Sequence, residues 1–239
     1  PYYLIVLMIF LALSNELWSA GMFIDGVYYA TISRNLSIGY GSFWNLYFTE
    51  LSGFFYAHPP LAIWLQSILF SAFGDNIYIE RIYSFSTFII TGFFIHLIWK
   101  EITNKKYASY SWVALLCWAI IPLNGWACSN NFLENTMNIF VSSSIFFAIK
   151  NIQTEDKKYM FISAIMVAFA FLSKGFTGVF PLSVYFCFFL LFPEIGFRKM
   201  IIKSIQIIIF SLIPLLLLLI IQPSFFEYFV NYLDIQVLE

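Results

Sequence analysis

The chain has 239 residues, of which 61% are hydrophobic, 22% aromatic and only 10% charged, and its formal net charge is −1. Soluble globular domains carry roughly 25% charged residues, and the mean hydropathy of +0.83 places this chain among integral membrane proteins. A near-zero net charge, without a Lys/Arg patch interleaved with base-stacking aromatics, excludes a nucleic-acid-binding footprint. Because the sequence begins at Pro1 inside an apolar run, we expect it to be a piece of a longer polypeptide.

Apolar stretches long enough to cross a bilayer recur along the chain. A spanning helix needs about 20 predominantly apolar residues. Seven stretches approach that length, at about 1–20, 80–99, 107–123, 133–149, 159–173, 176–192 and 201–221. A secretory signal peptide is an open alternative for residues 1–20, because "LWSA" resembles a cleavage site. We expect an all-α, polytopic membrane protein with about seven transmembrane helices, forming a single module over residues 1–239.

One further apolar stretch, "PPLAIWLQSILFSAFG" at 59–74, is short and opens with two prolines. Runs of roughly 10–14 apolar residues are more often re-entrant or interfacial than spanning. If it does not cross, three loops with nine of the twelve basic residues share the cytoplasmic side, as the positive-inside rule requires, whereas crossing would put them on the side of Asp25. We therefore expect an interfacial helix within a long first extracytoplasmic loop at 15–79. The nine residues are Lys100, Lys105, Lys106, Lys150, Lys157, Lys158, Arg198, Lys199 and Lys203.

The first candidate catalytic residue is Asp25, in "MFIDGVYYATISRNL" at 22–36. Apolar residues recur there every four positions, which predicts a short amphipathic helix on the outer membrane surface; they are Ile24, Tyr28, Ile32 and Leu36. Asp25 has two interpretations. It either caps the helix by accepting from free amides of the first turn, or it is a general base whose pKa is tuned at the lipid–water boundary.

The second candidate acid is Glu134, in "CSNNFLENTMNIF" at the outer end of the fourth expected span. An acid in the first turn of a helix is favoured by the helix dipole alone. However, Asn131, Asn135 and Asn138 recur with it at helical spacing, which predicts one polar stripe. Unsatisfied amides are costly in hydrocarbon, so the stripe favours a lined cavity over contact with lipid.

Three basic groups on the outer side need an explanation. Lys174, in "FLSKGFTGVFPL", is either a snorkelling helix-end lysine or a phosphate anchor at a junction loosened by glycine. His58 precedes two prolines and is either an interfacial histidine or part of a site, while Arg81 either pairs with Glu80 or faces the same cavity.

Cysteine and metal-ligand patterns are weak. Cys117, Cys128 and Cys187 lack C-x-x-C spacing, which indicates neither a zinc site nor a disulfide framework. No metal-ligand cluster has compelling spacing, although a carboxylate and a histidine leave a divalent ion possible as a cofactor.

Taken in order, these segments resemble the polyprenyl-phosphate-sugar-dependent glycosyltransferases of the GT-C type, nearest to the protein O-mannosyltransferase and lipid A aminoarabinose transferase group. The resemblance runs from about residue 20 to 185 and rests on "YYATISRNL", "HPPLAIWLQSILFSAFG", "ERIYS", "NNFLENT" and "LSKG". It implies a seven-span module, helices lying along the membrane in the first outer loop, and a site at the outer face. Two positions depart from the family pattern, in which Asp-Glu is common where this chain has Asp25-Gly26 and Asp is common at Glu134.

The resemblance implies inverting transfer of a sugar from a polyprenyl-phosphate donor to a lipid, protein or glycan acceptor, in a bacterial inner membrane with the site facing the periplasm or exterior. It implies these roles: general base, Asp25; phosphate clamp, Lys174 with His58 or Arg81; orienting or acceptor-binding face, Glu134 with Asn131 and Asn135. The main alternative is a transporter or flippase, which predicts polar residues at mid-span and broken helices in matched halves. A non-catalytic scaffold is a third hypothesis, because the Glu expected at position 26 is missing.

Overall fold

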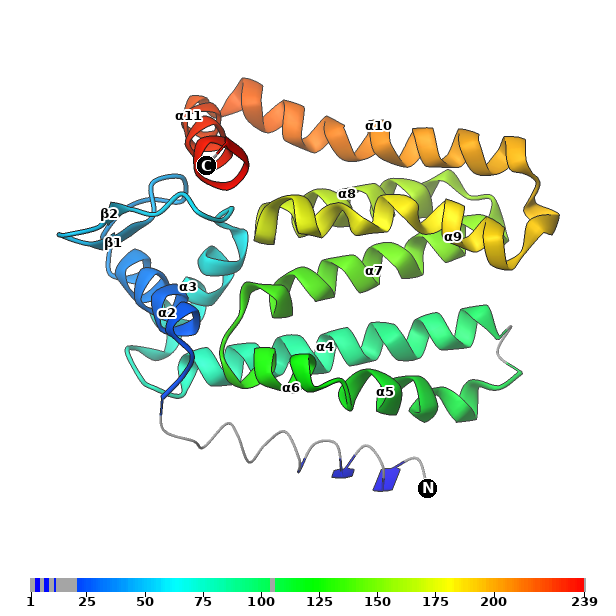
Figure 1. The fold of residues 1–239 in the computed structure, drawn as a ribbon, viewed down its shortest axis with the longest axis horizontal. Coiled ribbons are helices and arrows are strands. Elements are labelled where there is room, and N and C mark those ends of the chain that lie inside the picture. Colours follow the sequence, from blue (N-terminus) through cyan, green and yellow to red (C-terminus); the bar gives the residue numbers. More distant parts are fainter. Residues whose placement is uncertain (1–2, 5–6, 9–10, 12–20, 104–105, 239) are drawn as a thin grey trace.

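The computed structural model describes residues 3–4, 7–8, 11, 21–103 and 106–238, which are almost entirely helical (Figure 1). The span expected at 1–20 therefore lies almost wholly outside the described residues. The elements in chain order are α2 (Ile24–Ser37), β1 (Tyr47–Thr49), β2 (Gly53–Phe54), α3 (Leu61–Phe73), α4 (Ile79–Ile102), η1 (Ala108–Tyr110), α5 (Ser111–Ala119), α6 (Pro122–Ser129), α7 (Leu133–Thr154), α8 (Lys157–Lys174), η2 (Gly175–Ser183), α9 (Val184–Leu191), η3 (Pro193–Ile195), α10 (Phe197–Ile221), α11 (Pro223–Leu233) and η4 (Asp234–Leu238).

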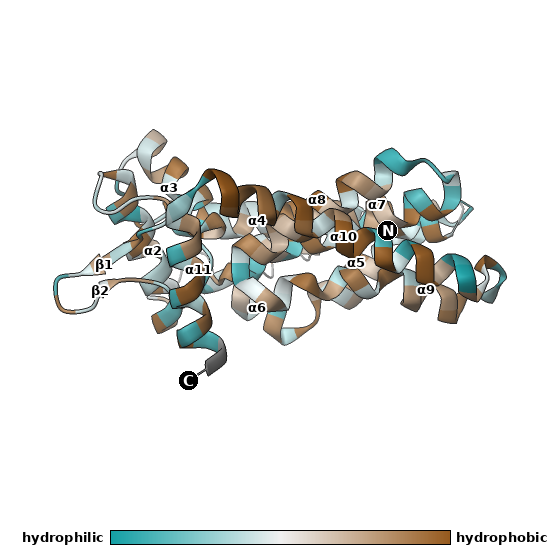
Figure 2. Ribbon diagram, turned by 90° about the horizontal axis from the view of Figure 1, so that it is seen from above, coloured by the Kyte–Doolittle hydropathy of each residue, from teal (hydrophilic) through white to brown (hydrophobic). Residues whose placement is uncertain are grey.

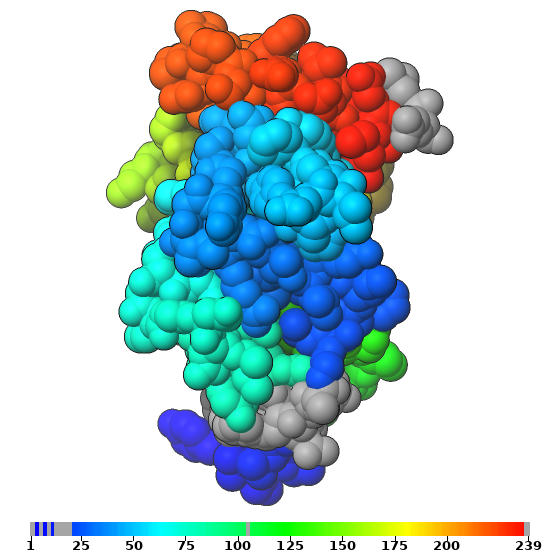
Figure 3. Space-filling model, turned by 90° about the vertical axis from the view of Figure 1, so that its left-hand side faces the viewer, coloured from blue at the N-terminus to red at the C-terminus, as the bar shows by residue number. Residues whose placement is uncertain are grey.

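The long helices lie alongside one another in the order α4, α7, α8 and α10 (Figure 1). Their directions bring the N-termini of α4 and α7 together with the C-termini of α8 and α10 at one end. We call this the first-loop end, because α2, the β1–β2 hairpin and α3 cover it together with α11 (Figure 3). Hydrophobic residues run along the middle of the long helices, and hydrophilic residues gather at the two ends (Figure 2). This distribution is the one expected of a multi-pass membrane protein.

The number of helices suited to crossing a membrane is smaller than expected. Among the described residues, three stretches are long and apolar enough, namely α4, Lys157–Leu191 and α10, and a fourth is added if α5 and α6 form one span bent by 75°. The segment expected at 107–123 is therefore broken rather than straight. Pro122 explains the break, because proline cannot continue the α5 helix and forces Ile121 into an extended conformation with ψ 116°.

Two of the expected spans, at 133–149 and 159–173, form a closely packed pair. The first of them, α7, is long enough to cross but is rich in buried serine, which lowers its hydropathy. Ser144 of α7 and Ser163 of α8 lie with their hydroxyl oxygens 2.9 Å apart, and each hydroxyl also donates to the other residue's carbonyl. The polarity of α7 therefore serves helix–helix contact within the bundle.

The stretch Lys157–Leu191 doubles back on itself at Gly175. Gly175 ends α8 with φ +75°, and a Cβ at Gly178 would overlap the backbone of Ala170. Segment η2 consequently runs back along α8, and α9 continues in that direction beside α10 (Figure 1). The expected boundary between the segments at 159–173 and 176–192 is thus where the chain reverses.

Helix α2 confirms the predicted helix in the first loop, but its buried face is different. Ile32 is fully buried against α3, whereas Ile24 and Tyr28, from the predicted apolar stripe, are exposed. Ser33 is buried instead, and its hydroxyl donates to Gln66 Oε1 at 2.9 Å. One face of α2 thus packs on the bundle while its exposed apolar residues face outward.

Helix α3 is the helix predicted at 59–74. It has 13 residues, which is too short to span a bilayer. Tyr29 of α2 and Leu133 of α7 share a buried cluster with its Ala62 and Ile63. Helix α3 therefore packs at the first-loop end, and its interfacial location remains a prediction.

The three basic loops meet at the opposite end of the bundle, which we call the basic end. Lys150 of α7 pairs with Glu101 of α4 at 2.8 Å, and Lys199 of α10 pairs with Glu155, which follows α7. Gln153 Nε2 also donates to the carbonyl of Glu101 at 2.8 Å. The predicted grouping of these loops on one side is confirmed.

Candidate active site

The most prominent ion pair at the first-loop end joins Lys174 and Glu134. Lys174 is the last residue of α8, and Glu134 lies in the first turn of α7. The ammonium of Lys174 donates to Oε1 of Glu134, and the two side chains are 14% and 36% exposed. The second oxygen, Oε2, is buried and has no hydrogen-bond partner among the described residues. A buried, unpartnered carboxylate oxygen is costly unless something else donates to it, so this atom is open to a ligand.

Asp25 lies in the first turn of α2, but it does not cap the helix. The N-cap position is Phe23, whose backbone N–H donates to Asn130 Oδ1 at 2.6 Å. The N-cap interpretation of Asp25 is therefore wrong. Its carboxylate is half-buried and makes no hydrogen bond or ion pair with any residue that the structure describes. An acid left without a protein partner is available to accept a proton.

Tyr29 is close enough to both acids to be affected by their negative charges. This residue is one turn after Asp25 and is only 4% exposed. Burial raises its pKa, and the negative charges of Asp25 and Glu134 raise it further. Asp25 and Glu134, 109 positions apart in the sequence, therefore act on the same hydroxyl, which stays protonated and can donate.

His58 lies in the loop before α3, between aromatic rings. Its ring centroid is 6.0 Å from that of Tyr29 and 6.2 Å from that of Phe55. Burial, and to a smaller extent the positive charge of Lys174, lower the pKa of His58 from 6.5 to about 4 against an opposing effect of Glu134. His58 is therefore near the ion pair but neutral at neutral pH, so it can offer an N–H to an anion but not a charge.

Helix α11 closes the site from the C-terminal side. The hydroxyl of Tyr228 donates to the carbonyl oxygen of His58. A Cβ at Gly175 would overlap the hydroxyl of Tyr232, so the glycine after Lys174 is required by this contact as well as by its φ. Sequence reasoning missed these tyrosines. Their signal was the aromatic spacing of Phe225, Tyr228 and Tyr232, which places all three on the buried face of α11.

Three predicted binding residues are occupied by protein contacts. Arg81 is 7% exposed and donates to the carbonyls of Ser129, at 3.2 Å, and of Gly21. Asn131 accepts from Gln66 Nε2 at 2.8 Å, and Asn135 donates to Ser84 Oγ and to the carbonyl of Ala127, each at 2.7 Å. These contacts fix the loop before α7.

The predicted polar stripe on α7 is wrong in two respects. Asn131 precedes the helix, in a left-handed conformation with φ 53°. Asn135 faces α4 and α6, whereas Glu134 faces Lys174, because consecutive helical residues point about 100° apart.

Arg81 was also predicted as a partner of Glu80, but the main ion pair of Glu80 is with another residue. Glu80 instead accepts from Arg34 at 3.3 Å, and Arg34 Nε lies 2.9 Å from Asp75.

The surroundings of Gly26 explain why this position holds glycine instead of the glutamate of the Asp-Glu pattern. A Cβ at this position would overlap the carbonyl oxygen of Asn130, and Asn131 Nδ2 donates to the Gly26 carbonyl at 3.3 Å. The loop before α7 therefore occupies the space that a glutamate side chain would need. Among the described residues, no three His, Cys, Asp or Glu side chains come together to hold a metal ion.

An apolar groove of about 260 Å³ runs between α8, η2 and α10 toward α11. Phe171 and Phe176, on either side of Lys174 in the sequence, line it together with leucines of α10 such as Leu215 and Leu219. The Lys174–Glu134 ion pair and this apolar groove together suit a ligand with a charged group and an apolar chain.

The family is shown by a family model described as dolichyl-phosphate-mannose-protein mannosyltransferase, which matches residues 57–223 of this chain. The chain belongs to this family. The matched part contains His58, Glu134 and Lys174, whereas Asp25 lies before it. Membership agrees with the GT-C resemblance that the motifs indicated.

A curated relative and two solved structures are also similar. Undecaprenyl phosphate-alpha-4-amino-4-deoxy-L-arabinose arabinosyl transferase 1 of Proteus mirabilis (strain HI4320) is 24% identical over 163 residues, which are 65% of this chain and 28% of the relative. The crystal structure of ArnT from Cupriavidus metallidurans in the apo state matches with a TM-score of 0.71 and 18% identity, over 98% of this chain and 42% of that chain. The same enzyme bound to undecaprenyl phosphate gives 0.70 and 16%, over 96% and 43%.

These structural matches show that the chain has the ArnT fold. They extend to nearly all of this chain and so include α2 with Asp25. The chain spans less than half the length of each of these relatives.

Proposed function

We propose that this chain is the membrane module of a glycosyltransferase that moves a sugar from a polyprenyl-phosphate donor to a lipid, protein or glycan acceptor. The relative from Proteus mirabilis is named for an undecaprenyl phosphate sugar donor, and one similar crystal structure contains undecaprenyl phosphate. The observation that carries the proposal is the Lys174–Glu134 ion pair, with groove-lining phenylalanines on either side of Lys174 in the sequence. Asp25, which has no partner among the described residues, acts together with Glu134 on the hydroxyl of Tyr29.

The groove and the ion pair suit the two parts of such a donor. An isoprenoid chain would lie in the groove along Phe171 and Leu215. Its phosphate would then approach the ammonium of Lys174, which is held by Glu134. Neutral His58 would add an N–H donor without adding a charge.

The chemistry is a single displacement. The acceptor oxygen forms a bond to C1 of the sugar as the C1–O bond to phosphate breaks, and the polyprenyl phosphate leaves with the bonding electrons. The acceptor proton passes to the Asp25 carboxylate. The negative charge that develops on the phosphate is stabilised by Lys174. One attack from the face opposite the phosphate inverts C1.

The remaining predicted residues act by positioning. Arg81, Asn131 and Asn135 fix the loop before α7 through carbonyl, amide and hydroxyl contacts. That loop carries Glu134 into place, and Glu134 orients Lys174 and offers its free Oε2 to an acceptor hydroxyl.

The site and the basic loops lie at opposite ends of the bundle. Because short cytoplasmic loops collect Lys and Arg, the basic end would face the cytoplasm. The site would then face the periplasm or exterior, in the inner membrane of a bacterium.

Native mass spectrometry of the gently solubilised full-length protein tests the proposal without a guess about the sugar. We expect a polyprenyl-phosphate species to copurify with the wild type and with Asp25→Asn, and to be reduced at least about tenfold in Lys174→Ala, because a charge-assisted contact to phosphate is lost. Lys106→Ala, at the basic end, is the matched control and should retain the lipid. Absence of the species from every variant, while other lipids are retained, would favour a transporter or scaffold instead.

A further inference from the structure

A second charged cleft lies at the basic end, about 530 Å³ in volume, between the end of α7 and the beginnings of α8 and α10. None of its lining residues belongs to the site around Lys174 and Glu134. It is thus a separate feature that glycosyl transfer does not use.

The cleft is strongly positive. Four cations line it, Lys157, Arg198, Lys199 and Lys203, together with a single acid, Glu155. Glu155 is paired with Lys199. Three positive charges in the lining are therefore left without a lining acid, which favours an anion.

Lys203 places one of these positive charges at a buried position in the cleft. Although it is only 7% exposed, its ammonium donates to one acceptor among the described residues, Asn151 Oδ1, at 2.7 Å. The hydroxyl of Tyr185 donates to the same oxygen at 3.0 Å. An ammonium has three N–H donors, and a buried one with donors unused is costly unless an acceptor reaches it.

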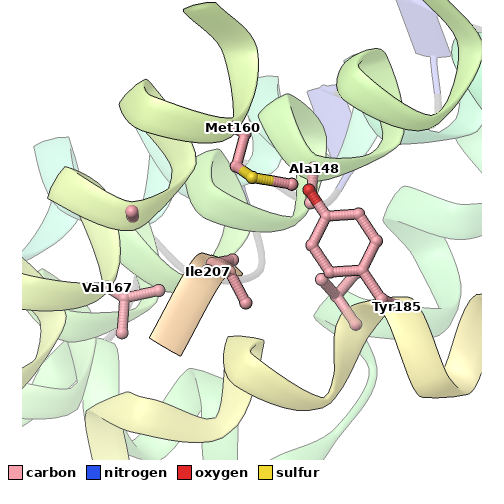
Figure 4. Close-up of a cluster of buried hydrophobic side chains, with 7 residues drawn as sticks. Ala148, Met160, Val167, Tyr185 and Ile207 are labelled. Carbon is pink, nitrogen blue, oxygen red and sulfur yellow. The ribbon is translucent and has the colours of Figure 1, made fainter. Parts of the chain in front are cut away.

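A hydrophobic cluster seals the inner wall behind Lys203. Met160, which lines the cleft, packs with Tyr185, Ala148 and Ile207, and the Tyr185 hydroxyl points toward Met160 and Ala148 (Figure 4). An acceptor for Lys203 therefore has to come from the cleft side.

The beginning of α10 adds backbone donors. Gly196 is its N-cap, with φ +81°, and no side chain caps the helix. Gly196, Phe197 and Arg198 all line the cleft. The first N–H groups of a 25-residue helix are thus directed at the same space as Lys203, an arrangement that favours phosphate.

We propose that this cleft binds the phosphate group of an anionic membrane phospholipid. Phosphate oxygens satisfy Lys203 and the start of α10, while Arg198 and Lys199 hold the outer side of the headgroup. Phe197 and Ile202, which line the cleft and are 63% and 45% exposed, offer an apolar surface on which acyl chains lie. A general excess of basic residues in cytoplasmic loops explains exposed lysines, but it does not explain a buried one inside a cleft.

The test is a native mass spectrometry titration of the delipidated full-length protein with dioleoyl phosphatidylglycerol, dioleoyl phosphatidylcholine or inorganic phosphate. We expect phosphatidylglycerol to bind the wild type in preference to phosphatidylcholine. Its apparent Kd should rise about tenfold in Arg198→Gln/Lys199→Gln and at least as much in Lys203→Met. Lys106→Gln, a basic-end control outside the cleft, should bind as the wild type does.

The exposed double variant keeps the test valid if Lys203→Met fails to fold. Inorganic phosphate that competes with phosphatidylglycerol would support the same phosphate site. Phosphate binding that Arg198→Gln/Lys199→Gln weakens, without a preference for phosphatidylglycerol over phosphatidylcholine, would overturn the lipid assignment. Equal phosphatidylglycerol binding by the wild type and the double variant would overturn the site.

Discussion

At the first-loop end, two acids are left incompletely paired, whereas at the basic end acids pair with bases across helices and the unmatched groups are cations of the cleft. Asp25 has no partner among the described residues and one oxygen of Glu134 has none either. By contrast, Lys150 pairs with Glu101, and Lys199 pairs with Glu155. The two ends contain similar residue types, so the difference lies in what the fold leaves unsatisfied.

The partners of a charged residue therefore say more about its role than the sign of its charge does. Arg81 and Lys174 are both basic residues at the first-loop end. Arg81 donates to two backbone carbonyls, while Lys174 is held by a single carboxylate. Only the second arrangement leaves a cation whose partner can be exchanged for an anion.

Among variants that leave Asp25 in place, the largest effect is expected from Glu134→Gln, which removes the charge that holds Lys174. We expect kcat for sugar transfer to fall by about 10²-fold, because the ammonium loses its fixed position. Lipid donor retention should persist, since Lys174 remains positive. Donor turnover and donor retention, measured on the same preparation, check this. Loss of retention together with turnover would mean that Glu134 acts in donor binding instead.

A change at Gly26 should damage the first-loop end by packing alone. In Gly26→Ala the new methyl overlaps the Asn130 carbonyl, so we expect a stability loss of roughly 1–3 kcal/mol. Gly92→Ala is the matched control, because its Cβ would make an ordinary 3.5 Å contact with Trp118. Thermal unfolding of the two variants measures the difference, and equal melting temperatures would contradict the close approach.

The pH dependence of stability should report on His58. Its pKa is about 4 in the folded protein and near 6.5 when unfolded, so the unfolded state binds more protons between these values. Stability should therefore fall as the pH drops from about 6.5 to 4, by roughly 1–3 kcal/mol. Thermal unfolding across this range should show a weaker dependence in His58→Gln. An identical slope in the variant would show that His58 is not buried in its neutral form.

The smallest effect is expected from Tyr228→Phe, which removes the hydroxyl that donates to the carbonyl of His58. One hydrogen bond contributes about 1 kcal/mol, so the melting temperature should fall by about 2–4 °C. Tyr40→Phe, at an exposed tyrosine of the same end, is the control. Equal shifts in both variants would show that the Tyr228 hydroxyl of α11 does not stabilise the His58 loop.

Much of the architecture was predictable from hydrophobic runs and loop charges. The helices at 80–99, 159–173 and 201–221, the reversal near Gly175 and the grouping of basic loops all follow from local sequence. The broken α5–α6 pair was less accessible. Pro122 marked the break, but an apolar run by itself does not give a bend angle.

The site was predictable only in part, because partners come from distant segments. Lys174 and Glu134 were singled out separately, and the fold joins them across 40 positions. No local pattern reveals that Asn131 bonds Gln66, or that Asn135 points away from Glu134. Tyr228 of α11 lies 170 positions from His58, whose carbonyl it contacts, beyond the reach of helical periodicity.

The most direct test of the central claim is to follow, by mass spectrometry, the conversion of the copurified donor to free polyprenyl phosphate in the presence of a cell-envelope acceptor extract. The matched variants are Asp25→Asn and Asp75→Asn, the latter at an acid whose side chain is 74% exposed at the same end. We expect the wild type and Asp75→Asn to release polyprenyl phosphate, and Asp25→Asn to retain the donor with conversion slowed by about 10²–10⁴-fold, as for loss of a general base. Conversion by Asp25→Asn at the wild-type rate would contradict the account.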